Sequence, residues 1–203
     1  MYLTQVKVDK RELLINRIYD NYHWKKVLCR AIPPKKDKGG KTRFYLFRVY
    51  DRGAYTEVLI QSEQCPIAQN FGTWHSKEIP GNFYSWSKYQ YDIVCYPSIK
   101  KNRYSDTGER LKNSRRRSIP LEQCIPWMVG KLKDIGCVGT SINMTPQGIS
   151  VYPHKGSEVN VTAIQFSGVL EVADRDLFIS GVQSGIGPEK AFGYGLLLLK
   201  PIK

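Results

Sequence analysis

The order of predicted elements in the second half of the chain is the feature that most restricts its fold. Runs of alternating apolar residues and runs with helical spacing follow one another, with glycine and proline between them. The sequence predicts a strand at 89–96, a helix at 120–135, a hairpin at 138–144 and 148–152, strand-like segments at 159–166 and 169–172, a helix at 174–183 and a last strand at 194–200. Apart from the extra strand-like segments between the two helices, the order is strand, helix, two strands, helix and strand, which is that of a ferredoxin-like or split βαβ domain.

The first half predicts a less regular copy of this pattern. We expect a strand from Leu3, helices at 11–19 and 21–31, and a hairpin at 43–50 and 54–61. Asn21 is a suitable N-cap for the second of these helices. Whether a further helix follows at 63–70 stays open. Pro80-Gly81-Asn82 is typical of a linker, so we expect domains at 1–82 and 88–203.

Positive charge is concentrated in one polar segment. The net charge is +13, which favours a polyanionic partner, nucleic acid before membrane, although a solvated basic surface is the alternative. Residues 100–117 carry eight cations against Asp106 and Glu109, a net +6. We predict a loop here that binds the phosphates of a nucleic acid through Lys100, Lys101, Arg103, Arg110, Lys112, Arg115, Arg116 and Arg117.

A glycine-rich segment lies near the end of the chain. Four glycines and Lys190 occur between Gly185 and Gly195, after a predicted helix and before a predicted strand. A dinucleotide-binding fingerprint has the reverse order, since its glycines follow a strand and open a helix. We therefore expect a segment that packs closely against its own domain or against a polyanion.

Metal and cofactor chemistry is not indicated. No cluster of Asp, Glu and His has the spacing of metal ligands, so we expect no cofactor and disfavour two-metal hydrolysis. The five cysteines are dispersed, which favours reduced thiols over disulfides or a zinc site. The chain shows no signal-like start and no apolar run of membrane-spanning length. We expect a cytoplasmic protein without a membrane partner.

The glycine-rich segment resembles the signature of CRISPR-associated repeat-cleaving endoribonucleases of the CasE family. Further segments resemble the family in the same order: Met1-Tyr2-Leu3-Thr4-Gln5-Val6, Val58-Leu59-Ile60-Gln61-Ser62, Tyr96-Pro97-Ser98-Ile99-Lys100, Arg115-Arg116-Arg117, Trp127 and Val169-Leu170-Glu171-Val172. Together they span nearly the whole chain. The resemblance implies an α+β fold of tandem ferredoxin-like (RRM-like) βαββαβ domains.

A cluster of polar residues could support cleavage of RNA without a metal. In that reaction the 2′-hydroxyl attacks the adjacent phosphate, which needs a base, an acid and positive charge. Tyr22, His23 and Lys25 lie at a predicted helix start, where free amides and the helix dipole favour phosphate. We expect these three residues to be catalytic.

The family resemblance points to the same helix start but leaves the roles open. It implies catalysis by a tyrosine and by a histidine three residues later, and the third residue after Tyr22 is Lys25. Either His23 takes the role of that histidine, or Lys25 supplies the charge and the acid, or cleavage is weak.

The resemblance also implies the substrate and the partners. The protein would cleave CRISPR repeat RNA at the base of its hairpin and keep the hairpin bound. It would cap the 3′ end of the guide RNA as a Cascade subunit, beside the backbone subunit. The alternative is a non-catalytic hairpin-binding subunit. Further RNA contacts are expected from Gly185, Gly187, Lys190 and Gly193, and from His154 and Lys155, for which a solvated loop is the alternative.

Overall fold

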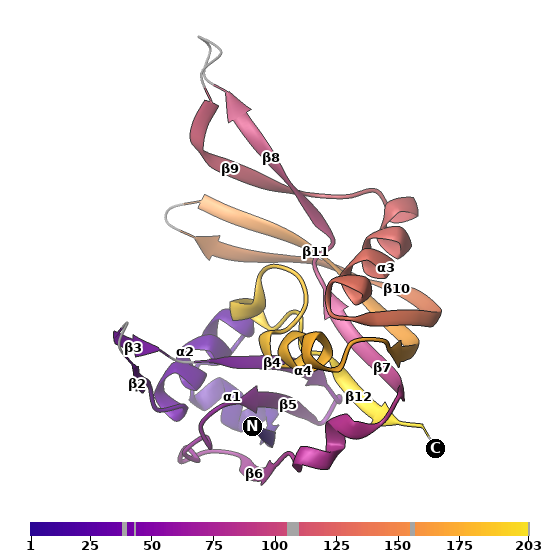
Figure 1. The fold of residues 1–203 in the computed structure, drawn as a ribbon. Helices are drawn as coiled ribbons and strands as arrows, with labels where there is room; N and C mark the ends of the chain where they lie inside the picture. Colours follow the sequence, from indigo (N-terminus) through magenta and orange to yellow (C-terminus); the bar gives the residue numbers. More distant parts are fainter. Residues whose placement is uncertain (38–39, 43, 105–109, 155–156, 203) are drawn as a thin grey trace.

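The computed structural model describes residues 1–202 except 38–39, 43, 105–109 and 155–156, and within 35–42, 101–104, 110–115, 152–154 and 157–159 it describes the backbone alone. The first half contains β1 (Tyr2–Asp9), α1 (Lys10–Ile15), α2 (Asn21–Ala31), β2 (Lys35–Asp37), β3 (Gly40–Thr42), β4 (Tyr45–Asp51), β5 (Tyr55–Ser62) and β6 (Thr73–Glu78). A 3₁₀ turn at Gly81–Ser85 leads into the second half (Figure 1).

The first sheet has the strand order of a ferredoxin-like domain. Its order is β4-β5-β1-β6 and all of its pairs are antiparallel. Residues 63–72 connect β5 to β6 without a helix, which answers the open question at 63–70. α1 is shorter than the predicted helix at 11–19, because Arg17 adopts a left-handed backbone with φ of 55° and ends it.

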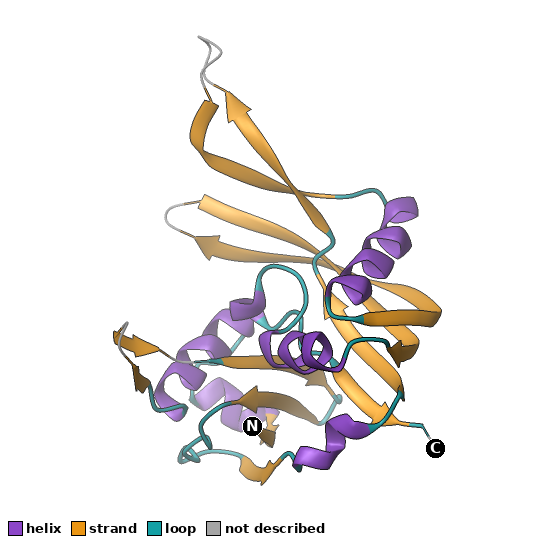
Figure 2. Cartoon of the chain, in the orientation of Figure 1, coloured by secondary structure: helices purple, strands orange, loops and turns teal. Residues whose placement is uncertain are grey.

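The second half contains both the main sheet and a separate hairpin. Its elements are β7 (Lys88–Cys95), β8 (Ser98–Tyr104), β9 (Arg110–Ser118), α3 (Cys124–Asp134), β10 (Cys137–His154), β11 (Ser157–Val172), α4 (Arg175–Ser184) and β12 (Leu198–Pro201). The sheet order is β10-β11-β7-β12, again antiparallel and ferredoxin-like. β8 and β9 pair only with each other among the described strands, and they project beyond the sheet (Figure 2).

Two predictions for the second half are wrong in detail. The predicted hairpin at 138–152 is part of one strand, β10, and the segments at 159–172 form its partner β11. The apparent turn is a bulge between Pro146 and Gly148, where one residue is inserted without reversing the chain. The last strand begins at Leu198 instead of 194.

The prediction of a loop at 100–117 is also wrong. Most of this segment forms the antiparallel strands β8 and β9. Its polar residues favour a loop in the sequence, but a two-stranded ribbon can expose both faces to solvent and so needs no apolar alternation.

Each half has its own core, and polar contacts join the halves. Alternate residues of β7, such as Tyr91 and Ile93, pack beneath α3 and α4. Between the halves, Gln61 donates from its amide to the Val182 carbonyl (3.0 Å), and Arg48 forms an ion pair with Asp92. The expected boundary between 82 and 88 stays a prediction. None of the described helices is long and apolar enough to cross a membrane.

Candidate functional site

The start of α2 is capped by an aspartate that also holds a histidine. Oδ1 of Asp20 accepts a hydrogen bond from the backbone N–H of His23 at 2.8 Å, and it lies 2.7 Å from Nδ1 of the His23 ring. The prediction of Asn21 as the N-cap is wrong, since Asp20 has the extended backbone and the capping contact. A carboxylate at Nδ1 favours the tautomer with its proton there, which leaves Nε2 as a base.

Tyr22 lies between the other two predicted catalytic residues. Its half-buried ring packs against the second half in a cluster that includes Tyr194, and its centroid is 6.0 Å from that of the His23 ring. Successive residues of an α-helix are rotated by about 100°. His23 and Lys25 therefore flank Tyr22 on opposite sides.

Two lysines bring positive charge to the same helix start. The ammonium of Lys26 lies 4.3 Å from the centroid of the Tyr22 ring, and that of Lys25 lies 5.0 Å from the centroid of the Phe192 ring. Contacts of a cation with an aromatic face restrain the side chain without neutralising its charge. Both ammonium groups thus keep a charge that can attract phosphate.

The glycine-rich segment closes over the start of α2. Asn21 donates from Nδ2 to the Phe192 carbonyl at 2.8 Å. At Gly193 φ is 86°, and a Cβ added there would lie 2.9 Å from that same Nδ2 and 3.1 Å from the Phe47 ring. A residue with a side chain could not keep this approach without a shift. The glycine-rich segment, which belongs to the second half, therefore packs against α2 and β4 of the first half.

Lys190 has a structural contact within this segment. Its ammonium donates to the carbonyl of Ser184 at 2.7 Å, at the last residue of α4. Burial lowers the pKa of Lys190 below its ordinary value, and the nearby charge of Lys131 acts in the same direction. The predicted contact of Lys190 with RNA stays a prediction.

The hairpin β8–β9 places cations directly opposite one another. Lys100 pairs in register with Arg116, and both are exposed, as is Arg117. Like charges at such a position destabilise a strand pair. A polyanion bound to the hairpin would remove this repulsion.

The other predicted RNA contacts on strands can be placed only by backbone. They are Lys101 and Arg103 in β8, Arg110, Lys112 and Arg115 in β9, and His154 at the end of β10. Lys155 lies outside the described residues.

The glycine-rich segment links the two predicted regions. Gly187 lines a pocket together with Arg116 at the base of the hairpin, whereas Gly193 contacts Asn21 at the start of α2. The structure thus places Tyr22, His23 and Lys25 in the first turns of one helix, with the rings of Tyr22 and His23 close together and Lys25 on the other side of Tyr22. Residues 185–195 connect this helix start to the basic hairpin.

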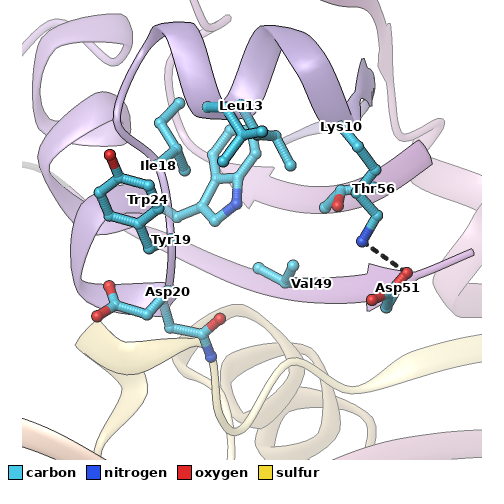
Figure 3. A pocket seen from close by; sticks show the side chains of 11 residues that line it. Lys10, Leu13, Ile18, Tyr19, Asp20, Trp24, Val49, Asp51 and Thr56 are labelled. Atoms are coloured by element: carbon cyan, nitrogen blue, oxygen red, sulfur yellow. Dashed lines mark ion pairs between the residues drawn. The ribbon is translucent and has the colours of Figure 1, made fainter. Parts of the chain in front are cut away.

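Another pocket, which lies beside α2, lacks the positive charge expected of a phosphate site. It has a volume of about 400 Å³ and lies between α1, α2 and the strands β4 and β5. Figure 3 shows Tyr19 and Asp20 at one end and the ion pair of Lys10 with Asp51 (2.7 Å) at the other. Because the charged residues that line it are one lysine and two carboxylates, Lys10, Asp20 and Asp51, we assign no RNA phosphate to it.

Asp20 and Lys26 contact the site but are not among the catalytic residues predicted from the sequence. The spacing of each residue in the sequence indicates its contact. Asp20 precedes His23 by three residues, which is the distance from an N-cap residue to the backbone N–H that it contacts. Tyr22 and Lys26 are four residues apart, which places them side by side on a helix. Within the described ranges, no group of three His, Cys, Asp or Glu is arranged to hold a metal.

Comparison with known proteins extends over the full chain. The profile of a family described as "CRISPR associated protein" matches residues 1–201. "CRISPR system Cascade subunit CasE" of Escherichia coli (strain K12) is 27% identical over 216 residues, which covers 100% of both chains.

Two solved structures agree with the fold. Cas6e from Escherichia coli K-12 has a TM-score of 0.76 at 24% identity, with 100% of both chains covered. The CRISPR endoribonuclease Cse3, bound to a 19 nt RNA, has a TM-score of 0.79 at 20% identity, covering 99% of this chain and 100% of the other. The tandem ferredoxin-like fold class and the resemblance seen in the sequence are confirmed. The chain belongs to the CRISPR-associated protein family.

Proposed function

We propose that this protein is a metal-independent endoribonuclease that cleaves CRISPR repeat RNA at the base of its hairpin. Its relative CasE is named a Cascade subunit, and Cse3 is named an endoribonuclease bound to RNA. The observation that carries the catalytic part is the contact of Asp20 with His23 at the start of α2. That contact prepares Nε2 of the imidazole to act as a base.

The proposed reaction is an internal transfer of the phosphoryl group. Nε2 of His23 accepts the proton of the 2′-hydroxyl, and the 2′-oxygen forms a bond to the adjacent phosphorus. The bond from phosphorus to the 5′-oxygen breaks, and that oxygen takes a proton from Lys25 or Tyr22. The products are a 2′,3′-cyclic phosphate and a 5′-hydroxyl. The charges of Lys25 and Lys26 stabilise the transition state.

The proposed complex with RNA follows from the positive charge of the protein hairpin β8–β9. The exposed cations of β8 and β9 bind the RNA stem, and the product hairpin stays bound. The protein remains at the 3′ end of the guide RNA in Cascade, next to a backbone subunit, in the cytoplasm. The alternative is a subunit of the same complex that binds the hairpin and cleaves weakly or not at all.

Single-turnover cleavage in EDTA tests the catalytic proposal. The substrate is the repeat RNA encoded beside the gene, and the variants are His23→Ala, Lys25→Ala and Tyr22→Phe. Loss of a general acid or base lowers the rate by about 10²–10⁴ with nearly unchanged binding. Arg30→Ala, in the last turn of the same helix, is the control and should cleave like the parent.

The pattern of loss decides between the readings. Loss in His23→Ala supports His23 as the base, whereas loss only in Lys25→Ala assigns the proton transfer to the lysine. If all three variants cleave like the parent, the site is elsewhere. A parent that binds the hairpin tightly and never cleaves it supports the binding subunit.

A further inference from the structure

A pocket at the base of the basic hairpin has the composition of a nucleotide site. It lies between the first residues of β8, the end of β9, α3 and the glycine-rich segment, and it has a volume of about 420 Å³. Pockets for small ligands have volumes of about 300–1,000 Å³. The space is therefore large enough for one nucleotide unit.

Two cations from different elements line this pocket. Arg116 comes from β9 and Lys131 from the last turn of α3. Lys131 pairs with the exposed Asp134 (2.6 Å), while Arg116 has no carboxylate partner among the described residues. The nearby Lys190 feels the charge of Lys131, since its pKa is lowered partly by that charge. The excess of positive charge favours an anionic ligand.

A buried hydroxyl in the pocket lacks a hydrogen bond. Ser98 is only 6% exposed, and its Oγ has no partner in the described structure. A buried polar group without a partner is destabilising, and such groups are rare in folded proteins. If the Ser98 side chain turns toward the pocket that it lines, an oxygen of a bound phosphate or sugar would satisfy this donor.

An aromatic wall completes the pocket. The Trp127 ring stacks on Phe166, with a centroid distance of 6.3 Å and an interplanar angle of 28°. Gly187 has φ of 80°, and a Cβ added there would lie 3.3 Å from the Trp127 ring. The glycine thus lets the loop approach the ring. Apolar rings of this kind accept the sugar or base of an RNA nucleotide.

We propose that this pocket binds one nucleotide of the RNA, with its phosphodiester against Arg116 and Lys131 and an oxygen at the Ser98 hydroxyl. The inference rests on the proposed function and adds an anchoring point separate from the start of α2. Ser98, Trp127 and Lys131 then become RNA-binding residues, in addition to the hairpin cations.

Binding of a repeat hairpin at several NaCl concentrations tests the pocket. The RNA carries a 2′-deoxynucleotide at the base of its hairpin so that it stays intact. Ser98→Ala should weaken binding by about tenfold, as expected for a lost hydrogen bond to a charged group. Its unfolding midpoint should be unchanged or raised, because the hydroxyl has no partner in the free protein.

Lys131→Gln should reduce the salt slope of binding by about one, as for the loss of one phosphate contact. Lys133→Gln, on the same helix but exposed and outside the pocket, is the matched control and should keep the parental slope. If Ser98→Ala proves destabilised, the salt slope of Lys131→Gln decides alone.

Two results would overturn the inference, and they differ. If Ser98→Ala and Lys131→Gln bind like the parent, the pocket does not contact RNA, while the proposed function stands. If the parent binds no repeat hairpin at all, the proposed function fails and the inference fails with it.

Discussion

At the scale of single residues, the capping aspartate of α2 has two roles that one substitution can separate. Asp20 caps the helix through its contact with the backbone N–H of His23, and it orients the ring of His23 through Nδ1. Asparagine caps a helix as well as aspartate does, but it has no charge and its amide can face Nδ1 as a donor. The helix and the orientation of the histidine therefore need not fail together.

We predict that Asp20→Asn lowers the single-turnover cleavage rate by about 10²-fold, because the imidazole loses its fixed tautomer. The unfolding midpoint and the affinity for RNA should stay near the parental values. Asp20→Ala should lose the rate and also about 1 kcal/mol of stability, since alanine does not cap. Equal cleavage by Asp20→Asn and the parent would contradict a positioning role for Asp20.

At the scale of elements, the cations of the hairpin β8–β9 lower the stability of the free hairpin and would favour binding of RNA. Lys100 and Arg116 are like charges opposite each other across the strand pair, so they repel in the free protein, and a bound polyanion would relieve this repulsion. We predict that replacing Arg115, Arg116 and Arg117 together by glutamine weakens binding of the RNA hairpin. The dependence of log affinity on log salt concentration should become less steep, by about one per lost phosphate contact. Thermal unfolding should not occur earlier. An unchanged salt slope would show that RNA does not bind to β9.

Elements whose apolar residues recur with the period of a helix or strand could be predicted from the sequence. Pairings between distant segments could not. The helix at 21–31 and the hairpin near 51–53 occur as expected, because their apolar spacing and turn residues are local signals. The sequence predicts two short strands in place of β10, because Pro146 and Gly148 resemble a turn, although they form a bulge against β11. The bond from Asn21 to Phe192 joins residues 171 apart, and no local pattern encodes it.

At the scale of the whole molecule, buried thiols make the free energy of unfolding depend on pH in the alkaline range. Burial raises the pKa of Cys137 to about 12 and raises that of Cys95 further. In the unfolded chain a thiol ionises near pH 8.5. Above that pH the unfolded state binds fewer protons than the folded state, so the free energy of unfolding falls as pH rises.

We predict that the urea midpoint is constant between about pH 6 and 8 and falls above about pH 8.5. Cys137→Ala should be less stable at neutral pH but should lose less on going to pH 10, because one buried thiol is gone. Cys65→Ser, at an exposed position, is the control and should follow the parent. An equal fall for Cys137→Ala and the parent would contradict the assignment.

The contact of the glycine-rich segment with α2 also determines when the site is complete during protein synthesis. α2 leaves the ribosome well before residues 185–195, because more than 150 residues separate the two segments in the chain. Until they emerge, the hydrogen bond from Asn21 to Phe192 cannot form. A translation product that stops before residue 185 carries Tyr22, His23 and Lys25 without the segment that closes over them. Chains that stop before this segment therefore cannot form the contact that closes over the start of α2.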